Sequence, residues 1–193
     1  RDTRRVRRGL GTIRQDLNVS IGCGDRVEIK GCQDLAWIPR IIRLEMARQL
    51  HFYRLASELR ASNGLPSLPT HRDDDDYGVE ATVAAAAAEL LSVSFVDVGD
   101  QFQSCESSMI VDSLSEGSSV LGLRLAGFAG RLGSKEVDSE GSQLPRLGRE
   151  LASAAKLAGV RGIFHSDELP AYGITEAEVT GVIEALGCGD EDA

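Results

Sequence analysis

The most regular pattern in the chain is an alternation of apolar and polar residues over 11–21, GTIRQDLNVSI. From residue 13 onward the odd positions are apolar except for Gln15, and the even positions are polar, as in a half-buried strand. The turn signal Gly-Cys-Gly-Asp at 22–25 separates this run from a second alternation, RVEIK, at 26–30. We therefore expect residues 11–21 and 26–31 to pair as an antiparallel hairpin, with Val19, Val27 and Ile29 on its core face.

A helical periodicity follows over residues 38–61, with Pro39 in its first turn and Asn63-Gly64 after its end. Glu45 and Gln49 fall inside the apolar stripe of this helix. A buried carboxylate requires a cation or hydrogen-bond donors, so we expect Glu45 or Gln49 to contact the hairpin. That contact would be to the hairpin backbone or to a base, and the candidate bases are Arg14, Arg26 and Lys30. The alternative is that segments outside this sequence supply the partner, which would leave Glu45 exposed together with Ile42 and Met46.

The second half of the chain is rich in Ala and Gly and mixes helical with strand-like segments. The patterns predict helices over 79–93, over 146–158 with Gly159 after the end, and from the Thr175–Glu178 capping box through Leu186. They predict strands over 120–128 and over 160–165, the latter buried. Interleaved helices and strands predict an α+β domain of two layers.

We divide the chain at residues 62–78, which hold two Pro, two Gly and four consecutive Asp. The expected parts are a hairpin and long helix over 1–61, a linker or acidic loop over 62–78, and an α+β domain over 79–193. His71 and the Asp run suggest a metal site, but adjacent carboxylates cannot all converge on one ion, so a solvated loop is favoured.

Charge is segregated along the chain. Of 193 residues with a net charge of −9, residues 1–60 carry 13 basic and 7 acidic side chains, a net +6, which leaves −15 for the remainder. A basic head indicates an anionic partner such as a phosphate or nucleic acid. Only three basic residues are Lys, which is typical of a halophile, although a GC-rich genome also favours Arg.

Several classes of protein are disfavoured. No apolar run reaches the roughly 18 residues of a membrane span, and no signal-peptide core follows the first residues. The four Cys are widely spaced without a C-x-x-C pair, which favours reduced thiols in the cytoplasm.

The strongest chemical signal is the polar face of the predicted hairpin. Arg14, Asp16 and Asn18 lie on it opposite Arg26, Glu28 and Lys30. Cations beside paired carboxylates are what a nucleotide phosphate and its Mg²⁺ require. The alternative is an ordinary exposed sheet face with cross-strand ion pairs.

The motifs GTIRQDLNVSI, VEIKG and IPRIIRLEMARQ resemble the cradle (catalytic) domain of the tRNA-dependent amidotransferases, most closely the archaeal E-type, over residues 6–60. In that family the cradle binds ATP and Mg²⁺, phosphorylates the γ-carboxyl of Glu on tRNA(Gln), and lets ammonia displace the phosphate. The resemblance implies catalytic roles for Arg14, Asp16, Glu28 and Lys30 and ATP contacts from Gly11, Arg14 and Asn18, and it assigns no metal ligand. Cys32 departs from the small aliphatic residue of the family pattern.

A second resemblance covers residues 105–190, where LPRLGRE and RGIFHSDELPAYGIT are similar to the GAD insertion domain that the E-type amidotransferases share with bacterial-type aspartyl-tRNA synthetases. Within it, residues 165–168 (His-Ser-Asp-Glu) could form a hydrolase or metal cluster, but a turn whose Ser and Asp bond local backbone is favoured. The two resemblances imply an internal fragment of a haloarchaeal E-type amidotransferase chain, inactive by itself. Its partners would be Glu-tRNA(Gln) and an ammonia-supplying D-type chain, with no membrane.

Two alternatives remain. The first is a non-catalytic tRNA-positioning or protein-interaction module. The second, a fragment of an aspartyl-tRNA synthetase, is weak because no class II synthetase motif precedes the insertion.

Overall fold

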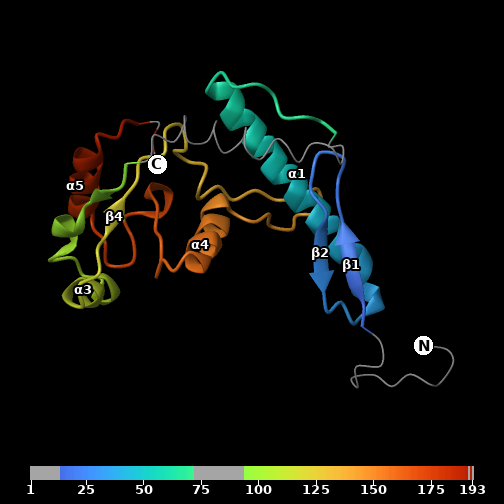
Figure 1. The fold of residues 1–193 in the computed structure, drawn as a ribbon, viewed down its shortest axis with the longest axis horizontal. Helices are drawn as coiled ribbons and strands as arrows, with labels where there is room; N and C mark the ends of the chain where they lie inside the picture. Colours follow the sequence, from blue (N-terminus) through green and yellow to red (C-terminus); the bar gives the residue numbers. More distant parts are fainter. Residues whose placement is uncertain (1–13, 72–93, 191, 193) are drawn as a thin grey trace. The chain divides into compact units, whose positions relative to one another are not determined.

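The computed structural model describes residues 14–71, 94–190 and 192 (Figure 1). The chain divides into two units, and their boundaries do not follow the chain in simple order. The first unit comprises Arg1–Asp76 together with Val137–Leu144, and the second comprises Tyr77–Glu136 together with Pro145–Ala193. Within the described ranges, no helix has both the length and the apolar character needed to cross a membrane.

The first unit begins with the predicted hairpin. Strands β1 (Asp16–Val19) and β2 (Val27–Lys30) pair antiparallel, with Asp16 opposite Lys30 and Val19 opposite Val27 (Figure 1). The antiparallel hairpin is confirmed, although the strands are shorter than the alternating pattern, and residues 11–13 lie outside the described residues. Val19 is buried and every polar member of the face is exposed, so the alternation separates a core side from a solvent side.

A one-turn helix η1 (Leu35–Trp37) leads into α1 (Ile38–Ser62). Pro39 lies in the first turn of α1, where a backbone amide would have no hydrogen-bond acceptor within the helix. The helix ends where Gly64 adopts φ 67°, a left-handed conformation that favours glycine. Helix 38–61 is therefore confirmed to within one residue.

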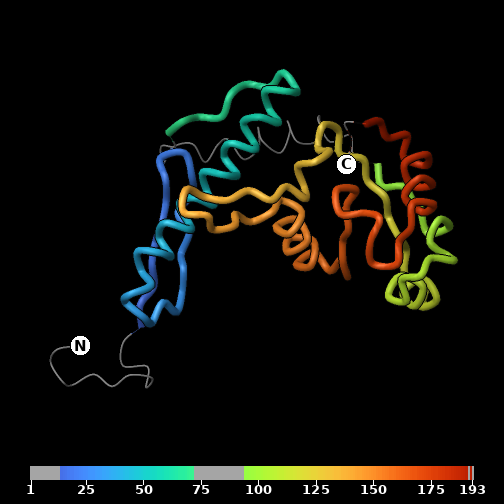
Figure 2. Tube along the Cα trace, turned by 180° about the vertical axis from the view of Figure 1, so that it is seen from behind, coloured from blue at the N-terminus to red at the C-terminus, as the bar shows by residue number. Residues whose placement is uncertain are grey.

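The third element of the first unit comes from far along the chain. Residues Val137–Leu144, here called the arm, belong to the same compact unit as α1 and the hairpin. In Figure 2 the arm is the yellow-orange segment that runs out to α1. No local sequence pattern indicated this placement.

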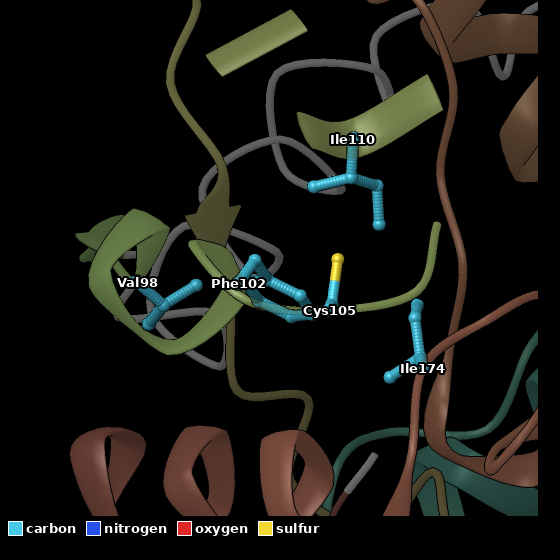
Figure 3. Packing of buried hydrophobic residues seen from close by; sticks show 5 residues of the cluster. All are labelled: Val98, Phe102, Cys105, Ile110 and Ile174. Carbon is cyan, nitrogen blue, oxygen red and sulfur yellow. The ribbon is translucent and has the colours of Figure 1, made fainter. Parts of the chain in front are cut away.

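The second unit packs short elements around a small apolar core. Its strands β3 (Val96–Asp97) and β4 (Leu121–Gly122) pair antiparallel. Its helices are η3 (Gly99–Phe102), α3 (Ser108–Ser115), α4 (Leu147–Leu157), η4 (Ser166–Glu168) and α5 (Glu176–Leu186). Figure 3 shows the buried cluster, with Phe102 beside Cys105 and with Val98, Ile110 and Ile174 around them.

The α+β class is confirmed, and so are the helices that the caps predicted. Helix α5 has the full Thr175–Glu178 capping box, and α4 is followed by Gly159 at φ 87°. The predicted helix over 79–93 lies outside the described residues.

Both predicted strands of the second half require correction. The buried strand over 160–165 is wrong, because this stretch pairs with no strand among the residues that the structure describes, and Val160 and Ile163 are 45% and 38% exposed. Within this stretch, Phe164 instead packs edge-on against the ring of Phe102, with 5.7 Å between the ring centroids. Of the strand over 120–128, only Leu121–Gly122 forms, and the rest is turn and loop.

Candidate functional site: the polar face of the hairpin

The register of the hairpin places four polar side chains on one exposed face. Asp16 lies opposite Lys30 and Asn18 opposite Glu28, and all four are exposed. Arg14 precedes β1 by two residues and reaches Asp16 with its side chain, so it joins the same face. This face, consisting of Arg14, Asp16, Asn18, Glu28 and Lys30, is called the polar face below. Arg26, which the sequence also predicted on it, is exposed and directly precedes β2, outside the paired residues.

The ion pairs of the polar face run along each strand rather than across the hairpin. Arg14 Nε lies 3.1 Å from Asp16 Oδ2, and Lys30 Nζ lies 3.2 Å from Glu28 Oε2. The cross-strand ion pairs of the alternative interpretation are not among these contacts. The Arg14 and Lys30 side chains are 65% and 60% exposed, and exposed pairs contribute at most about 1 kcal/mol. Both cations can therefore leave their carboxylates for a phosphate at little cost.

The other side of the hairpin is held to α1 by a buried amide. Gln49 donates from Nε2 to the Val19 carbonyl and accepts from the Ile21 amide at Oε1, both at 3.2 Å. The predicted contact of Glu45 or Gln49 with the hairpin backbone is therefore confirmed, and Gln49 makes it. Because the amide bonds both a donor and an acceptor of β1 and its turn, it fixes where the hairpin sits along the helix.

Glu45 is buried too, but its cation differs from those expected. Arg48, three residues along the same helix, donates from Nε and Nη2 to the two carboxylate oxygens at 2.8 Å each, and Gln49 Nε2 donates at 2.9 Å. The candidates Arg14, Arg26 and Lys30 do not fill this role. Burial alone would raise the pKa of Glu45, but the hydrogen bonds from Arg48 and Gln49 outweigh it and hold that pKa below its ordinary value.

Several of the remaining candidate residues fall outside the described part of the chain. Gly11 and the Asp run at 73–76 lie outside the described residues. Among the residues that the structure describes, no group of three or more His, Cys, Asp and Glu is arranged to hold a metal ion.

Asp167 in the His-Ser-Asp-Glu stretch has a structural role, as favoured, but its partners are remote. Its two carboxylate oxygens accept from the amides of Gly130 and Gly133 at 2.7 Å each. The expectation of local backbone partners was wrong for Asp167, because this carboxylate orders a loop more than thirty residues away.

The donor set of the polar face suits ATP with Mg²⁺. Arg14 and Lys30 are exposed cations for phosphate oxygens, and Mg²⁺ is usually held by one or two carboxylates together with substrate phosphates and water. Asp16 and Glu28 would be the carboxylates in that arrangement.

Comparison with known protein families identifies the family of the chain. A family model described as the GatB/GatE catalytic domain matches residues 1–110, more than half of the chain. The chain belongs to the GatB/GatE catalytic-domain family. A second model, the GAD domain, matches residues 110–193 of this GatB/GatE chain. The arm thus lies in the stretch matched by the GAD model, although it belongs to the compact unit of α1.

Curated relatives cover the whole chain. They are the E-type subunits of archaeal glutamyl-tRNA(Gln) amidotransferases. The chain is 45% identical to that of Thermococcus gammatolerans, 43% to that of Haloarcula marismortui and 42% to that of Pyrococcus horikoshii, in each case over 193 residues. These 193 residues are all of this chain and 26% of each relative. The chain therefore spans about a quarter of the length of these relatives.

Proposed function

We propose that this chain forms part of a tRNA-dependent amidotransferase that converts Glu-tRNA(Gln) to Gln-tRNA(Gln), and that the polar face forms one wall of its ATP site. The observation that carries the proposal is the exposed group of two cations, two carboxylates and an amide on a hairpin of the GatB/GatE family. The names of the relatives supply the substrate class.

Each residue of the polar face has a separate part in this proposal. Arg14 and Lys30 bind phosphate oxygens and neutralise the charge that develops as the γ-phosphoryl group moves to the Glu γ-carboxyl. Asp16 and Glu28 would hold Mg²⁺, which would neutralise charge on the phosphates when bound. Asn18, with Gly11 before the strand, contacts the nucleotide. An ammonia-supplying D-type chain is the proposed partner, and the cytoplasm the proposed location.

The support beneath the polar face matters to this function. Phosphoryl transfer depends on positioning more than on covalent chemistry by the protein, so the face must keep its geometry. The Gln49 side chain forms hydrogen bonds with β1 and with the turn that follows it. Glu45, which is paired with Arg48, accepts a further hydrogen bond from Gln49. These two layers of contacts hold the functional side chains on a fixed backbone.

The test uses the full-length protein reconstituted with its ammonia-supplying partner. Asp16→Asn and Glu28→Gln each remove one charge and keep the size of the side chain. We expect each to lower the rate of amide formation by roughly 100-fold or more, because one electrostatic contact to a transition state is worth about that much. Binding of Glu-tRNA(Gln), measured separately by filter retention, should stay within about twofold.

Asp25→Asn is the matched control, because it removes the same charge from the turn of the same hairpin, outside the polar face. It should retain the parental rate. Amidation that survives both polar-face substitutions would contradict the catalytic assignment and favour the non-catalytic, tRNA-positioning module instead.

A further inference from the structure

The arm is ordered by its own hydrogen bonds. Val137 and Gln143 form an antiparallel bridge, and the Asp138 amide donates to the Ser142 carbonyl at 2.8 Å. Asp138 Oδ1 accepts from the amides of Glu140 at 2.9 Å and Ser142 at 2.8 Å. One oxygen of the Asp138 carboxylate thus closes the turn, and the other, Oδ2, points to a partner outside the arm.

That partner is Arg43 on α1. Its guanidinium pairs with Asp138 Oδ2 through Nη1, while Nη2 lies 3.1 Å from Glu140 Oε2 and 3.4 Å from Ser142 Oγ. The Asp138 side chain is only 5% exposed and that of Arg43 28%. A planar, forked cation therefore meets three oxygens of the arm, and hydrogen bonds within the turn hold the Asp138 carboxylate that supplies one of them.

Charge, and not apolar burial, holds the arm to the helix. Only Asp138, Ser142 and Leu144 of the arm are partly buried, and Val137 is 63% exposed. Burial would raise the pKa of Asp138, but hydrogen bonds from the Ser142 and Glu140 amides and from Arg43 hold that pKa below its ordinary value. The carboxylate therefore stays charged near neutral pH.

We infer that Arg43 and Asp138 form a docking contact that fastens the arm to α1 within the first unit. The contact joins residues 95 positions apart, and Asp138 is preorganised for it before Arg43 arrives. The strength of this contact should depend on ionic strength, because salt screens an attraction between charges but strengthens an apolar contact. The arm should accordingly detach more readily as ionic strength rises.

Hydrogen–deuterium exchange of the full-length protein, read by mass spectrometry on peptides covering 137–144, tests this inference. Arg43→Gln should raise exchange in the arm roughly tenfold, because it removes a charge-assisted contact from a buried carboxylate. Arg43→Lys keeps the charge without the fork and should fall between. Arg54→Gln, on an exposed position of the same helix, is the control and should leave the arm unchanged.

Asp138→Asn separates docking from turn formation, since the amide oxygen can still accept from Glu140 and Ser142. Faster arm exchange in both Arg43→Gln and Asp138→Asn, with exchange of β1, β2 and α1 unaltered, supports docking. Faster exchange in Asp138→Asn alone overturns it, because Asp138 would then serve only its own turn. Arm exchange that slows between low and molar salt also overturns it, since that is the response of an apolar contact.

Discussion

Replacing Gln49 by leucine tests whether the buried amide holds the hairpin to α1. The substitution keeps the size and removes three hydrogen bonds, to the Val19 carbonyl, from the Ile21 amide and to Glu45. An unsatisfied buried backbone group costs about 1–3 kcal/mol, and two are created here. The two groups together cost about 2–6 kcal/mol and the added apolar surface offsets about 1–2 kcal/mol, so the middle of these ranges leaves an expected loss of about 2.5 kcal/mol in the free energy of unfolding.

The loss is large against the roughly 5–15 kcal/mol by which a domain is stable, so urea unfolding will detect it. The only tryptophan, Trp37, ends η1 at the start of α1, and its fluorescence therefore reports on the first unit. Arg54→Leu is the matched control on an exposed position of α1 and should change stability by no more than about 0.5 kcal/mol. A Gln49→Leu loss no larger than that of the control would refute the argument.

Three further outcomes are expected. Because the pKa of Glu45 is lowered in the folded state, its contribution to stability is present above its ordinary value of 4.5 and is lost as pH falls through the lower folded value. Arg48→Gln should remove that acid sensitivity in a pH series of unfolding curves, and an unchanged slope would exclude Glu45 as its source. Gly148→Ala should destabilise the second unit by about 1–3 kcal/mol, because a Cβ there would lie 2.4 Å from His165 Nε2. Gly162→Ala, which meets nothing within 4 Å, should be neutral in the same thermal melts, and equal effects would contradict the packing argument. If the acidic excess beyond residue 60 is a halophilic adaptation, the melting temperature should rise between about 0.1 M and about 3 M KCl, and a flat or falling curve would count against it.

Sequence was sufficient where the structural cause is local. The strict alternation of residues 13–21 has one core face, so it predicted both the hairpin and the residues that share the polar face. The caps of α4 and α5 are side-chain and glycine signals within a few residues of the helix ends, and both helices form where those signals placed them.

The sequence did not predict the contacts of residues whose partners lie far along the chain, and for Glu45 it pointed to the wrong cations. The apolar run at 160–165 fits either a strand or a core-contacting loop, and only the absence of a strand beside it decides for the loop. Arg48 was missed although its spacing of three from Glu45 on one helix is a recognised pairing distance. Asp167 and Asp138 resemble ordinary turn residues, because their partners lie in distant parts of the chain.

The discontinuous first unit has a kinetic consequence for a chain made from its amino terminus. Arg43 leaves the ribosome 95 residues before Asp138, and the whole stretch 77–136 is synthesised in between. Closing a flexible loop of that length costs roughly 4 kcal/mol of chain entropy, which a single ion pair does not offset alone. The arm should therefore be the last element to gain protection during refolding, after the hairpin has formed on α1 and after the intervening segment has become compact.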